Sequence, residues 1–183
     1  MKLYTFVADG QARIGVGLKE QIIDLSAAAT AMRVPRELPA DMLSFLRMGE
    51  AGLNAAREVV AFIQKRPPFP VGVQVAHLLD AVKLLAPIPR PPKILCSGIN
   101  YRGHMEENPG AKLPTEPFFF SKLPTAVIGP GEPIVRPRLT QQMDYEVEFA
   151  AVIGRQMKRT PPNQVMDCIA GYTILHDVSA RDV

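Results

Sequence analysis

The sequence is poor in cysteine and has no long apolar run. Two cysteines, Cys96 and Cys168, lie far apart among its 183 residues and form no CxxC motif. They indicate buried thiols in a reducing compartment and exclude a disulfide scaffold. No apolar run approaches the roughly 18 residues that a membrane span needs, so no membrane partner is expected. The first ten residues do not resemble a signal peptide, and we expect a cytoplasmic protein.

Clustered positive charge is also missing. The chain has 21 Lys and Arg and 18 Asp and Glu residues, a net charge of +3. Its basic runs do not exceed Lys158-Arg159, which excludes the electrostatic stripe typical of nucleic-acid-binding proteins. Hydrophobic residues make up 47% and charged residues 21% of the chain. These values are ordinary for a globular protein and exclude a disordered or collagen-like chain.

Proline, in contrast, is abundant, with 18 residues in the chain, or roughly twice the usual share. The prolines form no single block and recur between apolar runs. Proline breaks helices and confines strands to sheet edges and strand starts, because it lacks an N–H donor. From about residue 87 onward, the sequence therefore predicts short strands joined by rigid loops.

Residues 1–75 predict a small α+β domain. The first 25 residues alternate between apolar and polar, and Asp9-Gly10 predicts a hairpin turn within them. In segments 26–33 and 40–65 the apolar residues recur at helical spacing. The second of these helices is expected to stop before Pro67-Pro68.

Residues 76–92 indicate a linker, and residues 93–183 predict a β-rich second domain. Its strands are expected at residues 93–98, 118–122, 126–129, 133–135, 145–154 and 171–178. Two short helices are expected as well, at residues 100–107 and 161–169. The sequence contains no internal repeat, and its elements together predict the α+β class.

An acidic strand is the most informative motif. Residues two apart on a strand share a face, so Asp144, Glu146 and Glu148 are expected to point the same way. Near a buried strand end, such like charges repel and lose hydration. A bound divalent cation would offset both effects, and hard oxygen ligands favour Mg²⁺, Mn²⁺ or Ca²⁺ over zinc. The same alternation is also typical of a solvent-facing strand in an antiparallel sheet.

Further polar residues allow two interpretations each. Asp177, at the end of a strand, could reach a metal on a neighbouring strand or cap backbone N–H groups in a turn. His104 and Glu107 are three residues apart on a predicted helix, where they could activate water as a general base or form an exposed helix end. Lys122 could neutralise a substrate carboxylate or be an ordinary surface lysine.

From about residue 88 to residue 183 the chain resembles the fumarylacetoacetate hydrolase family. Four segments carry the resemblance in family order: PPKILCSGINYRGHMEEN, PFFFSKLPTAVIGPGEPIVRP, MDYEVEFAAVIG and GYTILHDVSARD. It implies a mixed β-sandwich roll with a small N-terminal α+β domain, assembled as a homodimer. Relatives continue well past the position of Val183. We therefore expect exposed sheet edges and poor activity from these 183 residues alone.

The resemblance also implies roles for individual residues. The ligands of a divalent metal, Mg²⁺ or else Mn²⁺ or Ca²⁺, would be Glu146, Glu148 and Asp177. The catalytic residues would be His104 and Glu107 on a lid helix, together with Lys122. The residues near the substrate would be Tyr101, Lys122 and Tyr145. Ser97 stands where fumarylacetoacetate hydrolases proper have a fourth carboxylate ligand, which favours the broader three-ligand group and another substrate. His176 stands where relatives often have Asn.

The expected activity is metal-dependent hydrolysis of a C–C bond in acylpyruvate-type or related 2-oxo acids. His104 would take a proton from water, and the leaving enolate would be stabilised by the metal. The same constellation would serve an isomerase of 2-hydroxyhepta-2,4-diene-1,7-dioate, which is the second expectation, or an oxaloacetate-type decarboxylase. From another class, the chain could be a non-catalytic binding protein of the same fold. The expected partner is a small 2-oxo acid, not nucleic acid.

Overall fold

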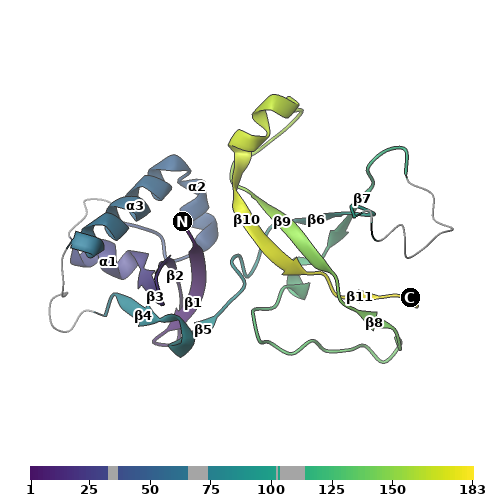
Figure 1. Ribbon diagram of the computed structural model, residues 1–183, viewed down its shortest axis with the longest axis horizontal. Helices are drawn as coiled ribbons and strands as arrows, with labels where there is room; N and C mark the ends of the chain where they lie inside the picture. The colour runs from purple at the N-terminus through teal and green to yellow at the C-terminus, as the bar shows by residue number, and fades with distance from the viewer. Residues whose placement is uncertain (33–36, 66–73, 102, 104–113) are drawn as a thin grey trace.

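The computed structural model describes residues 1–32, 37–65, 74–101, 103 and 114–183. Its N-terminal part contains a five-stranded antiparallel sheet with the strand order β4-β3-β2-β1-β5 (Figure 1). The strands are β1 (Leu3–Ala8), β2 (Gln11–Leu18), β3 (Gln21–Asp24), β4 (Ala76–Leu78) and β5 (Lys83–Leu84). Because β1, β2 and β3 are sequential neighbours that run antiparallel, short turns connect them.

The hairpin of β1 and β2 turns at Asp9-Gly10, as the sequence predicts. Asp9 has a φ of 51° and Gly10 a φ of 73°, and Ala8 pairs with Gln11 across the turn. A positive φ at both central residues defines a type I′ turn, whose twist matches that of the flanking strands. The Asp-Gly pair therefore fixes the register of the first two strands.

Three helices confirm the predicted helical segments: α1 (Leu25–Ala31), α2 (Met42–Arg47) and α3 (Glu50–Lys65). Asp24 caps α1 and Asp41 caps α2, each accepting a hydrogen bond of 2.9 Å from a backbone N–H of the first turn. Gly49, with a φ of 57°, separates α2 from α3, so segment 40–65 contains two helices. Among the described helices, none is long and apolar enough to cross a membrane.

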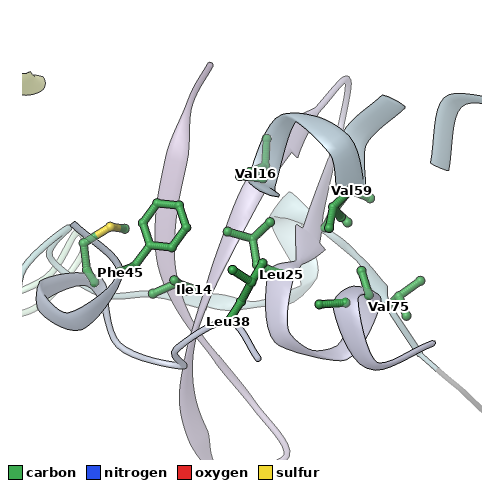
Figure 2. Close-up of a cluster of buried hydrophobic side chains, with 12 residues drawn as sticks. Ile14, Val16, Leu25, Leu38, Phe45, Val59 and Val75 are labelled. Atoms are coloured by element: carbon green, nitrogen blue, oxygen red, sulfur yellow. The ribbon is translucent and has the colours of Figure 1, made fainter. Parts of the chain in front are cut away.

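The helices and one face of the sheet enclose the larger hydrophobic core (Figure 2). Ile14 and Val16 of β2 belong to it with Leu25, Phe45 and Val59 from the three helices, and each of these residues is at most 2% exposed. A second, smaller cluster contains Phe6, Ala8 and Ile22. Full burial of one such side chain contributes about 1.5–3 kcal/mol to stability. This core therefore stabilises the N-terminal part strongly.

Two strands of the N-terminal sheet come from the predicted linker 76–92. β4 pairs with β3, and β5 pairs with β1. The Thr5 hydroxyl also donates a hydrogen bond to Pro87 O at 2.6 Å. Because Leu85 N also donates a hydrogen bond to Thr5 O, the chain is bound to the sheet as far as Leu85 and again at Pro87. The domain boundaries themselves stay a prediction.

The described residues of the remainder contain three two-stranded pairings joined by proline-rich loops (Figure 1). β6 pairs with β7, β8 with β11, and β9 with β10, each antiparallel. The strands are β6 (Ile94–Ser97), β7 (Phe119–Lys122), β8 (Met143–Asp144), β9 (Val147–Ile153), β10 (Ile169–His176) and β11 (Ser179–Ala180). The predicted strands at 93–98, 118–122, 145–154 and 171–178 are thus confirmed. The pairing of β9 with β10, called the β9–β10 ribbon below, is the longest of the three.

Three predicted elements of this part are wrong. Residues 126–129 and 133–135 are all described and form no strand. Prolines at positions 124, 130, 133 and 137 lack the N–H donors that a sheet ladder needs. The helix expected at 161–169 is replaced by two 3₁₀ turns. Within the described ranges the 3₁₀ turns are η1 (Leu79–Ala81), η2 (Pro124–Ala126), η3 (Pro162–Gln164) and η4 (Met166–Cys168).

Candidate active site

The β9–β10 ribbon carries three acidic residues on one face. Glu148 lies opposite Leu175, and Asp177 N donates a hydrogen bond to Glu146 O at 2.8 Å. Cross-strand partners and residues two apart share a face, so Glu146, Glu148 and Asp177 lie on the same side of the ribbon. The sequence placed the two glutamates together, and the strand register adds Asp177. These three residues are called the acidic face below.

A β-bulge sets this register. From Ile169 to Gly171 strand β10 advances two residues while β9 advances one, so Ala170 is extra. The backbone at Gly154 passes close to the bulge, and a Cβ there would lie 2.7 Å from the Cβ of Ala170. Only glycine fits this approach without a shift, because a contact that short is essentially never seen for a real Cβ.

Lys122 of β7 lies against the acidic face. Its ammonium forms an ion pair with Asp177 Oδ1 and donates a hydrogen bond to Val178 O at 3.3 Å. The side chain of Asp177 is 3% exposed. A carboxylate that is so deeply buried needs a counter-charge, because burial removes its hydration. Lys122, expected near the substrate, thus contacts a predicted metal ligand.

Arg181 connects two other acidic side chains of the site. Its Nε donates a hydrogen bond to Asp144 Oδ2 at 2.9 Å, and its Nη2 donates to Glu146 Oε1. The hydrogen bond to Asp144 is the largest of the effects that raise the pKa of the Arg181 guanidinium. Arg181 has no role in the sequence-based prediction. The sequence feature that could have pointed to Arg181 is a positive charge four residues after Asp177.

The thiol of Cys96 lies in the same cluster. Burial, followed by the negative charge of Asp177, raises the pKa of Cys96, and the nearby Lys122 ammonium opposes this rise. The sequence indicated that Cys96 and Cys168 are buried thiols that serve packing. That interpretation suits Cys168, which is 7% exposed. For Cys96 it is wrong, because the half-buried thiol lies among charged groups.

The other predicted site residues are placed as follows. The Tyr101 hydroxyl accepts a hydrogen bond from Phe149 N at 3.3 Å, which brings it to β9. Tyr145 is 73% exposed. His104 and Glu107 lie outside the described residues. The substrate roles of the tyrosines and the catalytic roles of His104 and Glu107 stay predictions.

The donor chemistry of the acidic face fits a hard divalent cation, because carboxylate oxygens are the ligands that Mg²⁺, Mn²⁺ and Ca²⁺ prefer. Asp177 Oδ1 is buried and, among the residues that the structure describes, accepts no hydrogen bond beyond its ion pair with Lys122. Within the described residues, however, no three His, Cys, Asp or Glu side chains already form a group that could hold a metal ion. Two of the three carboxylates instead contact Lys122 and Arg181.

Hollows lined by described residues lie in or beside this half of the structure. One, of about 290 Å³, follows the β6–β7 pairing and includes Ile94, Ser121 and Lys122 in its lining. The other, of about 480 Å³, lies between the segments 85–90 and 125–132. The smaller hollow shares Lys122 with the site, so a ligand bound in it would contact the residue that pairs with Asp177.

Comparison with known proteins agrees with these features. Residues 93–183, which include every residue of the acidic face, match the family model described as fumarylacetoacetate (FAA) hydrolase C-terminal. The chain belongs to the fumarylacetoacetate hydrolase family. The resemblance inferred from the four sequence segments is thereby confirmed.

Curated relatives of this family member include two mitochondrial oxaloacetate tautomerases. The one from Xenopus laevis is 39% identical over 175 residues, which cover 93% of this chain and 49% of that protein. The one from Rattus norvegicus is 36% identical and is covered to 54% by the whole of this chain. The chain thus spans about half the length of the curated relatives it matches. Because these relatives are mitochondrial by name, the expected cytoplasmic location stays a prediction.

Solved structures share the fold over the whole chain. Maleylpyruvate hydrolase from Sphingobium sp. SYK-6, in complex with manganese(II) ion and pyruvate, matches with a TM-score of 0.73 and 26% identity, and 60% of it is covered. Fumarylacetoacetate hydrolase from Exiguobacterium antarcticum matches with a TM-score of 0.68 and 31% identity, and 57% of it is covered. The expected fold class, an α+β fumarylacetoacetate hydrolase fold, is confirmed.

Proposed function

We propose that this family member acts on a 2-oxo acid through an enolate, with a divalent cation held by Glu146, Glu148 and Asp177. The observation that supports this is the common face of the three carboxylates beside Lys122. Three carboxylates on one side of a ribbon repel one another unless cations neutralise them. Lys122 and Arg181 neutralise two of them and leave a negative face that suits a further cation. Mg²⁺ and Mn²⁺ are the proposed ions.

The protein's own residues have distinct tasks in this mechanism. A cation bound at the acidic face would supply Lewis-acid stabilisation of the enolate charge. Lys122 Nζ would bind the carboxylate of the substrate, because an ammonium pairs well with a carboxylate in a partly buried site. His104 and Glu107, by family resemblance, carry the proton. Tyr101 anchors the chain segment before them to β9.

Tautomerisation of oxaloacetate is the reaction that we favour. The relatives named as oxaloacetate tautomerases match this chain at 36–39% identity. In that reaction the enol hydroxyl loses its proton and carbon 3 gains one, so no other atom is exchanged. A base and an acid near the enolate are sufficient for it, which the pair His104 and Glu107 would provide.

Hydrolysis of a C–C bond is the second candidate, because the maleylpyruvate hydrolase that shares this fold is described with manganese(II) and pyruvate. Here water would add to the distal carbonyl, the C–C bond would break, and the leaving enolate would take a proton. Isomerisation of a hydroxy-diene-dioate is supported more weakly, by an isomerase from Mycobacterium marinum with 27% identity. A homodimer remains part of the proposal.

The test compares Glu148→Gln with wild type and with Glu58→Gln, a matched control at an exposed glutamate of α3. Ultraviolet absorbance follows the decay of enol-oxaloacetate and, separately, the cleavage of an acylpyruvate, each with Mn²⁺ or with a chelator. We expect Mn²⁺-dependent enol decay in wild type and in Glu58→Gln, at a low rate in these 183 residues alone. Glu148→Gln should lose most of it, because one oxygen ligand of the cation is missing.

Three results would contradict this proposal in different ways. Equal rates with Mn²⁺ and with chelator would show that the reaction does not need the metal. Equal rates in wild type and Glu148→Gln would show that the reaction does not need the acidic face. Faster cleavage of the acylpyruvate than decay of the enol would replace the tautomerase with the hydrolase.

A further inference from the structure

Resting on the proposed function, we infer that Arg181 is a positioning residue that holds Glu146 ready for the cation, and that Asp144 holds Arg181. The guanidinium touches both carboxylates at once. Its Nε and Nη2 lie 2.9 Å from Asp144 Oδ2, and Nη2 also contacts Glu146 Oε1. The contact uses one oxygen of Glu146 and leaves Oε2 for a cation.

The backbone around Arg181 is fixed by its neighbours. Arg181 N donates a hydrogen bond to Gln142 O at 2.9 Å, which continues the pairing of β11 with β8. One residue later, Asp182 accepts hydrogen bonds from the hydroxyl of Thr140 and from Gln141 N. Thr140 is fully buried. The base of the Arg181 side chain is therefore held from both sides, which limits the positions that its guanidinium can reach.

Guanidinium geometry explains why arginine suits this place. Its N–H donors form a planar fork, which can serve two carboxylates in fixed directions. A lysine ammonium is a single point charge on a flexible stem, so it cannot hold two carboxylates in a defined relative orientation. Asp144 fixes one side of the fork, and the other side then determines where Glu146 points.

Stability alone does not account for the contact. The side chains of Arg181, Asp144 and Glu146 are 38%, 44% and 26% exposed. Ion pairs at such exposure contribute little to folding, typically about 0–1 kcal/mol. Partners that orient the ligands of a metal matter more, and their loss typically weakens metal affinity by about 10–100-fold. The expected effect of Arg181 is therefore on cation affinity.

The experiment measures Mn²⁺ affinity by calorimetry and by the electron paramagnetic resonance of free Mn²⁺. It uses the 183-residue chain, Arg181→Gln, Arg181→Lys, Asp144→Asn and the double variant with Arg181→Gln and Asp144→Asn. Arg57→Gln is the matched control, because Arg57 pairs with Glu50 on the surface of α3. Thermal unfolding of every variant shows whether the fold is retained.

We expect about a 10–100-fold weaker affinity for Arg181→Gln. Asp144→Asn should weaken binding less, and the double variant should bind no more weakly than Arg181→Gln, because Asp144 acts through Arg181. Arg181→Lys keeps the charge but should stay weak, and Arg57→Gln should match wild type.

The outcomes separate this inference from the proposed function. If wild type has no Mn²⁺ site that Glu148→Gln removes, the proposed function fails, and the inference fails with it. If wild type binds Mn²⁺ and Arg181→Gln binds equally or more tightly, the inference alone is overturned. Full recovery by Arg181→Lys would also overturn it, because charge and not orientation would then explain the effect. Additive losses in the double variant would overturn the role of Asp144.

Discussion

The N-terminal sheet with its helices and the β-rich half after residue 93 are packed very differently. In the first, Phe6, Ile14, Leu25 and Phe45 are at most 1% exposed. In the second, one face of the β9–β10 ribbon is apolar and open. Its exposed side chains, between 49% and 77% exposed, are Val147, Phe149, Ile153, Tyr172 and Ile174. This set is called the apolar face below.

The candidate site and the hydrophobic clusters lie in different halves of the molecule. The half that matches the family model contains the acidic face, whereas both hydrophobic clusters lie in the other half. On the β9–β10 ribbon the charges are turned inward and the apolar side chains outward, the reverse of a strand pair that stands alone in water. Large exposed apolar patches mark interaction surfaces or surfaces prone to aggregation.

The largest expected effect is on stability, and it differs between two phenylalanines, one from each half of the molecule. Phe45 is 1% exposed in the N-terminal core, and Phe149 is 66% exposed on the apolar face. Phe45→Ala should lower the free energy of unfolding by about 3–5 kcal/mol, because it leaves a cavity in a packed core. Phe149→Ala should change it by less than about 1 kcal/mol, because no cavity forms. Urea unfolding measures both. Equal losses would show that the apolar face is buried in solution.

An intermediate effect sharpens the contrast at the apolar face. A dye that fluoresces on apolar surfaces should bind the wild-type chain, and Ile174→Thr should reduce this signal, because Ile174 is 77% exposed among other apolar side chains. Leu78→Thr is the matched control, since Leu78 is 52% exposed on β4, away from the β9–β10 ribbon. An equal decrease in both variants would mean that the dye does not report on the apolar face.

The smallest expected effect is on the loss of stability at low pH. In the N-terminal part, hydrogen bonds from Ser44 lower the pKa of Asp41. In the β-rich half, hydrogen bonds lower the pKa of Asp182, first the bond from the Thr140 hydroxyl and second the bond from Gln141 N. Each carboxyl therefore adds stability above its unfolded pKa of about 3.9, and this stability is lost as the pH falls through the lower, folded pKa.

Asp41→Asn and Asp182→Asn should each flatten the loss of stability in acid, as measured by urea unfolding between neutral pH and pH 3. If the two halves unfold in separate steps, each variant should change only the step of its own half. No change in either variant would contradict the lowered pKa values. Asp80→Asn, at an exposed carboxylate, serves as the control.

Local signals made the N-terminal half predictable. The turn at Asp9-Gly10 needs two adjacent residues with positive φ, and helices α2 and α3 follow the spacing of apolar residues. In the β-rich half, strand β9 was predictable from its alternation. Residues 126–129 have an apolar composition like that of a strand, yet they pair with no strand in the described part of the chain, which composition does not reveal.

The site was predictable only in part, for the same reason. That Glu146 and Glu148 share a face follows from a two-residue spacing. The contacts of Lys122 with Asp177 and of Arg181 with Asp144 join residues 55 and 37 positions apart. They depend on which strands pair and in which register, and no local pattern encodes that. The position of Cys96 in the cluster depends on it as well.

The bulge at Ala170 has a consequence for the numbering of the site. If Ala170 were paired with Val152 and formed no bulge, Asp177 would stand opposite Tyr145, on the side of the apolar face. With the bulge, Asp177 stands beside Glu146. The bulge therefore decides on which side of the ribbon the third carboxylate emerges. A side chain at position 154 would crowd Ala170, so the missing side chain of Gly154 is what gives the bulge its room.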